Sequence, residues 1–312
     1  MAESPLISIA LCTYNGEEFI KEQMDSLLCQ SYANLEIIVV DDCSTDNTVS
    51  VLNQFVVNNT KIKLYRNDRN LGYNKNFEKA IKLCNGAFIA MCDQDDIWDT
   101  DKIKIQFEAI GDSELIYHDS EFIDSLGNPI HFKMSDKFNF YKGNSPLPFL
   151  YMNCVSGHSV LIKKSLLDSG FPFPEGFHYD QWLAFMAAYK GKIDFVDKCL
   201  VQYRQHDRNS TDILAVRSKH QKTSKEVKIE KLKQESLWLK VCSEHSQGAN
   251  FDLIMKLYQL CLKRNTSFIN LSYGWKIWKN EELLLFLLKK NKTSKFFFTL
   301  RKIWGPGTKR II

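Results

Sequence analysis

The feature that most constrains the fold is a repeated alternation of apolar runs with segments of helical periodicity. Short, nearly continuous apolar runs, typical of strands buried on both faces, lie at residues 6–11, 35–40, 62–65 and 88–92. The segments between them carry apolar residues at helical spacing, at 17–28, 48–57 and 74–84. Strands that alternate with helices predict an α/β fold, with a mostly parallel sheet covered by helices on both faces.

A polar turn lies just past the end of each of the four predicted strands. The turns contain Thr13 and Asn15, Asp41 and Asp42, Asn70 and Gly72, and Asp93, Asp95 and Asp96. The carboxyl ends of parallel strands lie at one edge of a sheet, and open α/β sheets bind their ligands outside that edge. We therefore expect the four polar turns to converge on one crevice.

The fourth turn concentrates negative charge. Asp93, Asp95 and Asp96 fall within four positions of a buried strand's end, where like charges repel and raise one another's pKa unless a cation lies among them. Mg²⁺ and Mn²⁺ take oxygen ligands, and Mg²⁺ is commonly held by one or two carboxylates together with substrate phosphates. The turn indicates a divalent metal site, although an acidic turn that caps the next helix would show the same pattern.

The two common phosphate-binding loops are absent from the sequence. No G-x-G-x-x-G follows the first strand, and no G-x-x-x-x-G-K-[ST] occurs anywhere. A phosphate-bearing ligand would therefore need its charge met by the metal.

The composition is that of a soluble globular protein. The 312 residues, of which 44% are hydrophobic and 25% charged, suffice for one large domain with an appendage or for two modest domains. Nine cysteines without C-x-x-C pairs favour a reducing compartment over a disulfide framework. The sequence shows neither a signal-peptide pattern nor a run of 18 apolar residues, so we expect no leader and no spanning helix.

Four sequence blocks resemble family 2 glycosyltransferases and occur in the same order as in that family: residues 7–16, 36–46, 66–72 and 93–98. Family members are inverting, nucleotide-sugar-dependent enzymes with the GT-A fold, a Rossmann-like, mostly parallel sheet with helices on both faces. The block at 93–98 is most similar to bacterial rhamnosyltransferase-type members that build surface polysaccharides. The likeness extends from about residue 6 to about residue 210.

The resemblance also implies a division of the chain. A GT-A catalytic domain would occupy 1–215, with a nucleotide-binding half at 1–98 and an acceptor-binding half at 99–215. Residues 216–312 would form a basic, amphipathic helical region.

Within the nucleotide-binding half, the resemblance implies a set of donor contacts. Asp42 matches the acid that hydrogen-bonds the pyrimidine base, although a carboxylate at this position would also suit a helix cap. Asp93 and Asp95 match the D-x-D pair that bridges a Mn²⁺ or Mg²⁺ ion to the donor diphosphate. The other expected nucleotide-sugar contacts are Thr13, Tyr14, Asn15, Glu17, Asn70, Gly72, Lys75 and Gln94.

Asp180 stands at the predicted start of an amphipathic helix, where the helix dipole favours an acid. The resemblance implies that it is the general base. Inversion in a single displacement requires a base, because the attacking hydroxyl must lose its proton opposite the leaving group. Asp96, Trp98 and Trp182 are expected near the sugar or the acceptor, and Asp96 also suits a third metal ligand or a helix cap.

Two later residues match the leaving-group side of the family's site. His206 corresponds to a position that completes the metal shell or contacts the diphosphate, and imidazole suits Mn²⁺ better than Mg²⁺. Arg204 would offset the charge of the leaving diphosphate. Both residues also suit plain loop positions at a domain edge.

Between the acidic turn at 93–98 and Asp180, the sequence predicts a strand that begins at 114 and leads into a hairpin turn at Gly127 and Asn128. His118 in this strand is expected to be structural. Residues 154–162 are similar to the later central strand of the family, and 163–169 are expected to be helical.

The C-terminal part has a different charge. Residues 256–312 carry 13 Lys and Arg against two Glu, whereas the rest of the chain is net negative. Aromatic residues beside these cations suit a helix in an anionic membrane interface, a helical cap on the catalytic domain or a dimer face. No nucleic-acid-binding module accompanies the charge, so we expect no nucleic-acid partner. The cysteines and the basic, aromatic C-terminal region together predict a cytoplasmic protein, peripheral on the inner face of the cell membrane.

The sequence therefore predicts an inverting, metal-dependent hexosyl- or deoxyhexosyltransferase. It would move a sugar from a UDP- or dTDP-linked donor to a hydroxyl of a glycan or lipid-linked glycan, in the synthesis of a surface polysaccharide. The alternative is a non-catalytic nucleotide-sugar-binding subunit that partners another transferase. A nucleotidyltransferase shares the α/β layout, but it usually has a Gly-rich signature after its first strand, which residues 12–16 are not.

Overall fold

The computed structural model describes residues 4–209, 213–214 and 225–311, with the last three as backbone only. Two compact units make up the chain. The first contains Met1–Asp136, Phe140–Asn144 and Cys154–Gln205, and the second contains Lys137–Asn139, Ser145–Asn153 and His206–Ile312. The predicted domain boundary at 215 lies outside the described residues.

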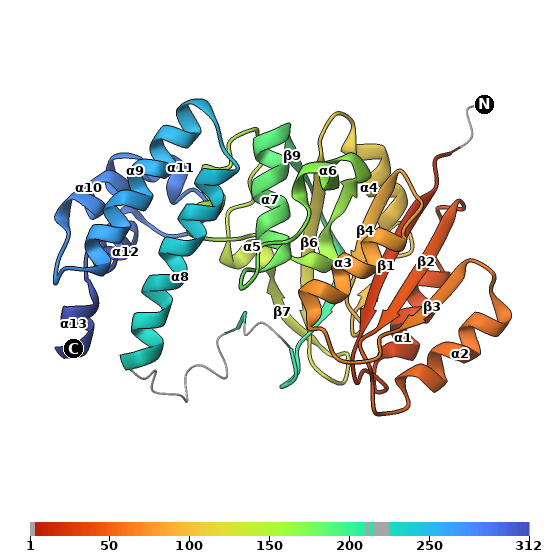
Figure 1. The fold of residues 1–312 in the computed structure, drawn as a ribbon. Coiled ribbons are helices and arrows are strands. Elements are labelled where there is room, and N and C mark those ends of the chain that lie inside the picture. The colour runs from red at the N-terminus through yellow and green to blue at the C-terminus, as the bar shows by residue number, and fades with distance from the viewer. Residues whose placement is uncertain (1–3, 210–212, 215–224, 312) are drawn as a thin grey trace. The chain divides into compact units, whose positions relative to one another are not determined.

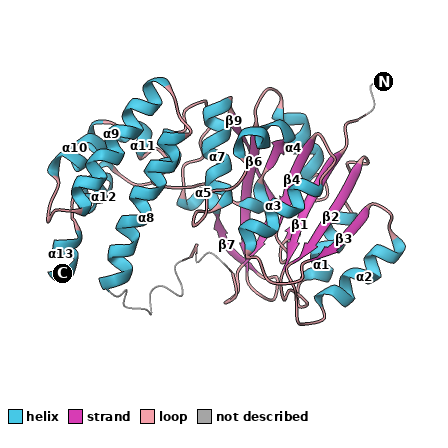
Figure 2. Cartoon of the chain, viewed as in Figure 1, coloured by secondary structure: helices cyan, strands magenta, loops and turns pink. Residues whose placement is uncertain are grey.

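The first unit is built on a nine-stranded sheet in the order β3-β2-β1-β4-β8-β6-β9-β5, with β7 paired to β6 (Figure 2). The strands are β1 (Ile7–Thr13), β2 (Leu35–Asp41), β3 (Ile62–Arg66), β4 (Phe88–Cys92), β5 (Ile97–Trp98), β6 (Leu115–Ile123), β7 (Pro129–Lys133), β8 (Leu161–Lys163) and β9 (Ile193–Arg204). The first four strands pair in parallel, and so do β6 and β9. Among the strands of the described residues, only β5, β7 and β8 run antiparallel, so the predicted mostly parallel sheet is confirmed.

Helices cover both faces of this sheet, as predicted (Figure 1). Helices α1 (Ile20–Leu28), α2 (Thr48–Asn58) and α4 (Lys102–Ile110) share a buried apolar cluster with alternate residues of β1 and β2. Figure 1 shows α3 (Tyr73–Leu83) and α7 (Tyr179–Lys190) in front of the sheet. The short helices are α5 (Met134–Lys137) and α6 (Leu167–Gly170), and 3₁₀ turns occupy Gly157–Ser159 and Lys164–Leu166. A further 3₁₀ turn, Leu147–Leu150, belongs to the second unit.

The register of the sheet brings the polar turns to one edge. Thr13 pairs with Asp41 across β1 and β2, and Leu11 pairs with Cys92 across β1 and β4. The residues that follow these strands therefore leave the sheet on the same side, which confirms the predicted convergence.

The segment 154–162 is only partly a strand. β8 does lie centrally, between β4 and β6, but it spans Leu161–Lys163, and Gly157–Ser159 forms a 3₁₀ turn. At Gly157 a Cβ atom would lie 1.9 Å from the Tyr179 hydroxyl oxygen, so only glycine leaves room for this tyrosine. The segment therefore bends around a side chain of α7 before β8 begins.

The second unit is helical, as the sequence predicts. Its helices are α8 (Lys225–Glu244), α9 (Gly248–Asn265), α10 (Leu271–Lys279), α11 (Glu281–Leu284), α12 (Lys292–Lys302) and α13 (Pro306–Ile311). Buried apolar side chains such as Leu239, Leu257 and Ile277 form its interior. In the described parts of the chain, each helix is too short or too polar to cross a bilayer.

Candidate active site

The first two polar turns are joined by side-chain hydrogen bonds. Asn15, in the left-handed backbone region with φ 48°, donates its N–H to Ser44 Oγ at 2.9 Å. Its own Oδ1 accepts from Thr45 N at 2.9 Å, and Glu17 Oε2 accepts from Asn47 N at the same distance. In this structure, the side chains of Asn15 and Glu17 thus brace the neighbouring turn.

Asp42 does not cap the next helix, because α2 begins at Thr48, after the N-cap residue Asn47. Asp41 closes the turn after β2. Its Oδ1 accepts from Ser44 N at 2.9 Å, and its Oδ2 accepts from Thr13 Oγ1 at 3.0 Å. Asp41 and Thr13 are both buried. Asp42 is therefore left for another task.

Asp42 holds the third turn. Its Oδ1 accepts from Asn67 Nδ2 at 2.7 Å and from Leu71 N at 2.8 Å, and its Oδ2 accepts from Gly72 N at 2.9 Å. Gly72 has φ 81°, a conformation that favours glycine, and Asn70 Oδ1 also accepts from its N–H. Since a carboxylate offers about four acceptor sites, Asp42 can accept roughly one further bond from a ligand.

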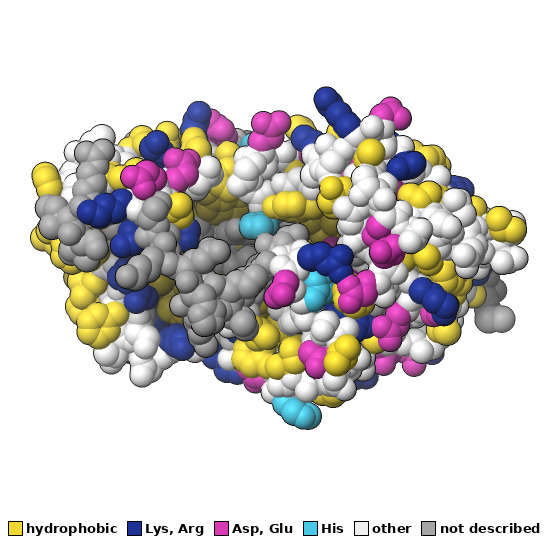
Figure 3. Space-filling model, turned by 90° about the horizontal axis from the view of Figure 1, so that it is seen from below, with side chains coloured by type: hydrophobic (Ala, Val, Ile, Leu, Met, Phe, Trp, Pro, Cys, Tyr) yellow, Lys and Arg dark blue, Asp and Glu magenta, His cyan; other side chains and the backbone are white. Residues whose placement is uncertain are grey.

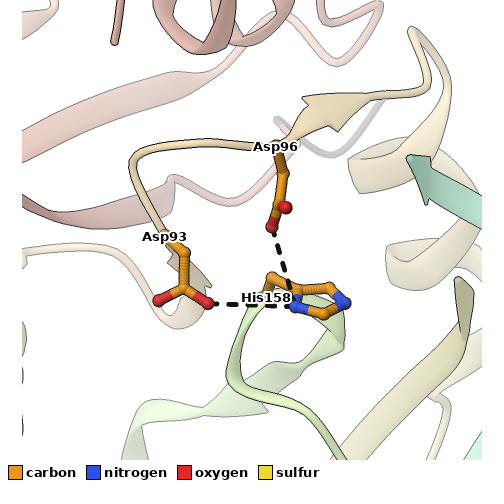
Figure 4. Close-up of side chains that lie close together, drawn as sticks. All are labelled: Asp93, Asp96 and His158. Atoms are coloured by element: carbon orange, nitrogen blue, oxygen red, sulfur yellow. Dashed lines mark ion pairs between the residues drawn. The ribbon is translucent and has the colours of Figure 1, made fainter. Parts of the chain in front are cut away.

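Asp93, Asp96 and His158 bring three potential metal ligands together (Figure 4). His158 Nδ1 lies 3.8 Å from Asp93 Oδ2 and 3.7 Å from Asp96 Oδ2, and one ligand atom from each residue falls within 4.8 Å of the others. Asp96 and His158 are buried, whereas the Asp93 side chain is 38% exposed. His158 Nε2 and Ser120 Oγ share a hydrogen bond of 2.8 Å, which orients the ring so that Nδ1 faces the acids.

Asp96 is held on one side and open on the other. Its N–H donates to Gln23 Oε1, and its Oδ1 accepts from Arg204 N, both at 3.0 Å. Its Oδ2 is buried without a hydrogen-bond partner, and burial, followed by the charges of Asp95 and Asp93, raises the pKa of Asp96 well above its ordinary value. Two carboxylate oxygens and an imidazole nitrogen, one of the oxygens unsatisfied, form a donor set that fits a divalent ion such as Mn²⁺.

Arg204 supports the acidic turn from the protein side. Its side chain is buried, Nε donates to Asp95 O at 2.8 Å, and Nη2 forms an ion pair with Glu22. The guanidinium also lies over the Phe19 ring, 4.8 Å from its centroid. These contacts fix the acidic turn, and the contact of Arg204 with the diphosphate stays a prediction.

Asp180 lies in the first turn of α7, in the neighbourhood of the acidic turn. Its Oδ1 accepts from Gln181 N at 2.6 Å. Burial raises the pKa of Asp180 to about 7, with the charge of Asp93 adding to the shift and the Gln181 N–H opposing it. A carboxyl group whose pKa lies near neutrality is suited to general base catalysis.

Residues 8–171 match the profile of Glycosyl transferase family 2, a span of just over half the chain. The chain belongs to glycosyl transferase family 2. The Escherichia coli enzyme UDP-Glc:α-D-GlcNAc-diphosphoundecaprenol β-1,3-glucosyltransferase WfgD is 32% identical to this glycosyl transferase over 185 residues, which cover 58% of this chain and 70% of WfgD. An uncharacterised glycosyltransferase of Rickettsia typhi is 28% identical over 218 residues, 67% of each chain.

Solved structures share the fold of this glycosyl transferase. S. aureus TarS 1-349 in complex with UDP-GlcNAc aligns with a TM-score of 0.61 over 95% of this chain and 87% of that chain, at 19% identity. The mannosyltransferase PcManGT from Pyrobaculum calidifontis, in complex with GDP-Man and Mn²⁺, aligns with a TM-score of 0.54 over 96% and 85%, at 14% identity. The predicted GT-A fold is thereby confirmed.

Several residues predicted for the site have other surroundings in the structure of this glycosyl transferase. Trp98 and Trp182 are 3% and 1% exposed, and the Trp182 Nε1 donates to Gly170 O at 2.9 Å. Both side chains lie in the interior of the first unit, and their contact with sugar or acceptor stays a prediction. Lys75 Nζ bonds both carboxylate oxygens of Glu78 at 3.2 Å.

His206 belongs to the second unit, where its Nδ1 accepts from Arg208 N at 3.2 Å. Its predicted place in the metal shell therefore stays a prediction, as does that of Asp95.

His158 is the site residue that sequence reasoning missed. Like His118, which is buried and whose Nδ1 bonds Asp119 O at 2.6 Å, it is a lone histidine in an apolar segment. Nothing local distinguishes the two. The antiparallel pairing of β8 with β4 brings the turn that holds His158 beside the acids that follow β4.

Proposed function

We propose that this glycosyl transferase moves a sugar from a nucleoside-diphosphate sugar to a hydroxyl of a glycan or lipid-linked glycan, with inversion at the anomeric carbon. The observation that carries the proposal is the juxtaposition of two kinds of group. The pKa of Asp180 is about 7, and the charge of the nearby Asp93 contributes to raising it. Asp93 in turn belongs to the cluster with Asp96 and His158. A base and a cation site together meet the needs of a single inverting displacement.

Each group then has a definite task. Asp180 accepts the proton of the acceptor hydroxyl as that oxygen attacks. Asp93, Asp96 and His158 would hold a Mn²⁺ or Mg²⁺ ion, which, when bound, supplies positive charge to the leaving diphosphate. Asp95 and His206 are the additional ligands that the family resemblance implies.

Asp42 supports a pyrimidine nucleotide in the donor. Its carboxylate can accept roughly one more hydrogen bond, and an imide N–H of uracil or thymine is a donor of that kind. The name of WfgD specifies UDP-Glc, and TarS was solved with UDP-GlcNAc. We therefore propose a UDP- or dTDP-linked hexose or deoxyhexose as the donor, and PcManGT, solved with GDP-Man and Mn²⁺, supports Mn²⁺ as the metal.

The acceptor and the membrane are linked in this proposal. The name of WfgD specifies a diphosphoundecaprenol acceptor, which resides in a bilayer. In the second unit, Trp275 is 67% exposed and Phe297 56% exposed, on α10 and α12, whose charged residues are all basic. Figure 3 shows hydrophobic and basic side chains next to one another on this unit. Such a surface suits an anionic membrane interface, and we propose that the protein lies peripherally on the inner face of the cell membrane.

The test of the catalytic proposal is transfer from a panel of radiolabelled nucleotide-sugars to lipid-linked acceptors. Asp180→Asn should lower the transfer rate by about 10²–10⁴-fold, the typical contribution of general base catalysis, with donor binding retained. Asp168→Asn, the same change at an exposed position of α6, is the matched control. Full activity of Asp180→Asn would remove the assignment of the base, and donor binding without any turnover by the wild type would indicate a non-catalytic partner subunit.

The membrane proposal has its own test. The double variant Trp275→Ser/Phe297→Ser should bind vesicles of anionic lipid at least about tenfold more weakly, because it removes two aromatic side chains that would insert into the membrane interface. Val57→Ser changes an apolar residue that is 83% exposed in the first unit, and it serves as the control. Equal vesicle binding by all three proteins would contradict the role of this surface.

A further inference from the structure

The first turn of α3 contacts the segment that leads into Asp180. Asn74 Nδ2 donates to Phe177 O at 2.6 Å, and the Tyr73 hydroxyl and His178 Nδ1 share a hydrogen bond of 3.1 Å. The Tyr73 and His178 rings also stack, with centroids 5.9 Å apart and an interplanar angle of 26°. α3 therefore contacts the chain two and three residues before Asp180.

One turn further along α3, a third bond holds the same segment. Glu78 Oε1 accepts from Phe173 N at 2.7 Å, and Glu78 is buried. Residues 171–178 contain no helix or strand. Since no backbone ladder fixes this segment, these side-chain bonds help to hold it in place, together with the buried Phe173 ring, which stacks on Tyr179.

The N-terminal end of α3 is also hydrogen-bonded to β2 and to Asp42, at the donor end of the site. Asp42 accepts from the N–H groups of Leu71 and Gly72, and Gly72 immediately precedes α3. Asn76, in the first turns of α3, donates to Val40 O at 2.8 Å. One helix thus connects the acid proposed to read the base with the acid proposed to deprotonate the acceptor.

We infer that Tyr73 and Asn74 are positioning residues for Asp180, which set where its carboxylate lies relative to the donor. The inference rests on the proposed role of Asp180 as the base. The position of a base matters steeply, because a misplacement of about 1 Å can cost on the order of a hundredfold in rate. The burial of Tyr73, and then the charge of Asp180, raise the pKa of Tyr73, which is consistent with their proximity.

Two variants remove the contacts separately. Asn74→Ala deletes the bond to Phe177 O, and the higher helix propensity of alanine offsets part of the lost stability. Tyr73→Phe deletes the bond to His178 and retains the stacked ring. Asn53→Ala, at an exposed position of α2, is the matched control for the asparagine change.

The measurements are kcat for sugar transfer, the donor Kd and the midpoint of thermal unfolding. We expect kcat to fall about ten- to hundredfold in Asn74→Ala and by a smaller factor in Tyr73→Phe, with the donor Kd within about twofold of the wild type. A merely structural role would weaken donor binding and kcat together, and that outcome would overturn the inference. Retained kcat in both variants would overturn it as well.

Comparison with Asp180→Asn separates this inference from the proposed function. If Asp180→Asn is inactive while both α3 variants keep their kcat, only the positioning role fails. If Asp180→Asn is fully active, the proposed base itself is wrong. Should Asn74→Ala fail to fold, Tyr73→Phe, which removes a single hydroxyl group and keeps the ring, still decides the question.

Discussion

Gln94 pairs with the backbone of Tyr14 through both ends of its side-chain amide. Gln94 Oε1 accepts from Tyr14 N at 2.8 Å, and Gln94 Nε2 donates to Tyr14 O at 3.1 Å. This clamp ties the acidic turn after β4 to the polar turn after β1. A Cβ atom at Gly16 would lie 2.3 Å from Gln94 Oε1, so the glycine leaves the space that the amide needs.

Gln94→Ala should therefore loosen the donor crevice. Loss of the two bonds should lower the free energy of unfolding by about 1–2 kcal/mol and raise the donor KM several-fold, because the Asp93 turn is no longer fixed to β1. Donor titration of the transfer rate and urea unfolding measure the two effects. Gln54→Ala, at an exposed position of α2, is the control; a donor KM equal to that of the wild type would show that the clamp is dispensable.

The activity should depend on pH through Asp180. The carboxyl group must be ionised to act as a base, and its pKa is raised to about 7 by burial and by Asp93. The transfer rate should therefore fall by about tenfold per pH unit below about pH 7. The rate profile from about pH 5 to pH 9 checks this, and a rate that stays flat down to about pH 5 would contradict it.

Stability should show the opposite dependence on pH. Because the pKa of Asp180 is higher in the folded protein than its ordinary value of 3.8, the folded state holds the proton more tightly. The associated stability is fully present below the unfolded pKa and is lost as pH rises through about 7. Asp180→Asn lacks this loss, so it should be more stable than the wild type at about pH 8, by at most about 4 kcal/mol. Urea unfolding of the metal-free protein at about pH 4 and pH 8 provides the comparison, and an unchanged difference between the two proteins would contradict it.

The sequence predicted the framework of the site more completely than its contacts. The apolar runs and the polar residues after them predicted β1 to β4 and their turns correctly, because these patterns are local and each run is almost entirely apolar. The task of each polar side chain was harder to predict. Asp41 and Asp42 are neighbours of the same type, and only the folded backbone shows that Asp41 caps the turn while Asp42 holds Leu71 and Gly72.

Residues that depend on long-range pairing were the least predictable. His158 joins the acids because β8 is inserted antiparallel beside β4, an order that no local pattern reveals. Trp98 is predicted to lie near the sugar or the acceptor, yet the Lys102 ammonium lies over its ring at 3.3 Å and both side chains are buried. Sequence proximity to a site does not determine which way a side chain points.

His158 should contribute to metal affinity. If it is a ligand beside Asp93 and Asp96, His158→Ala should weaken Mn²⁺ binding by about tenfold or more, measured by calorimetry on the metal-free protein. His245→Ala changes an exposed histidine directly after the end of α8 and is the control. A loss of affinity in His206→Ala but not in His158→Ala would favour the ligand set that the family resemblance implies over the cluster in the structure.

The stability of the second unit should depend on the buried ion pair between Arg264 and Glu235. Arg264 is completely buried, and its Nη1 lies 3.2 Å from Glu235 Oε1, which also accepts from the Tyr273 hydroxyl at 2.6 Å. Burial alone would raise the pKa of Glu235, but the charges of Lys302 and Arg264 hold it below its ordinary value. The glutamate is therefore ionised at neutral pH and compensates a cation that water does not reach.

Glu235→Gln should consequently cost about 3–5 kcal/mol, since it leaves the Arg264 charge buried without a counter-ion. Glu230→Gln is the matched control. Glu230 Oε2 lies 3.5 Å from Lys233 Nζ, both side chains are more than half exposed, and such a surface pair contributes about 0–1 kcal/mol to stability. Two units need not unfold together, so hydrogen exchange of α9 and α12 in the full chain is the appropriate measurement. Exchange in these helices should accelerate in Glu235→Gln and not in Glu230→Gln; equal rates in the two variants would mean that the buried charge is compensated in another way.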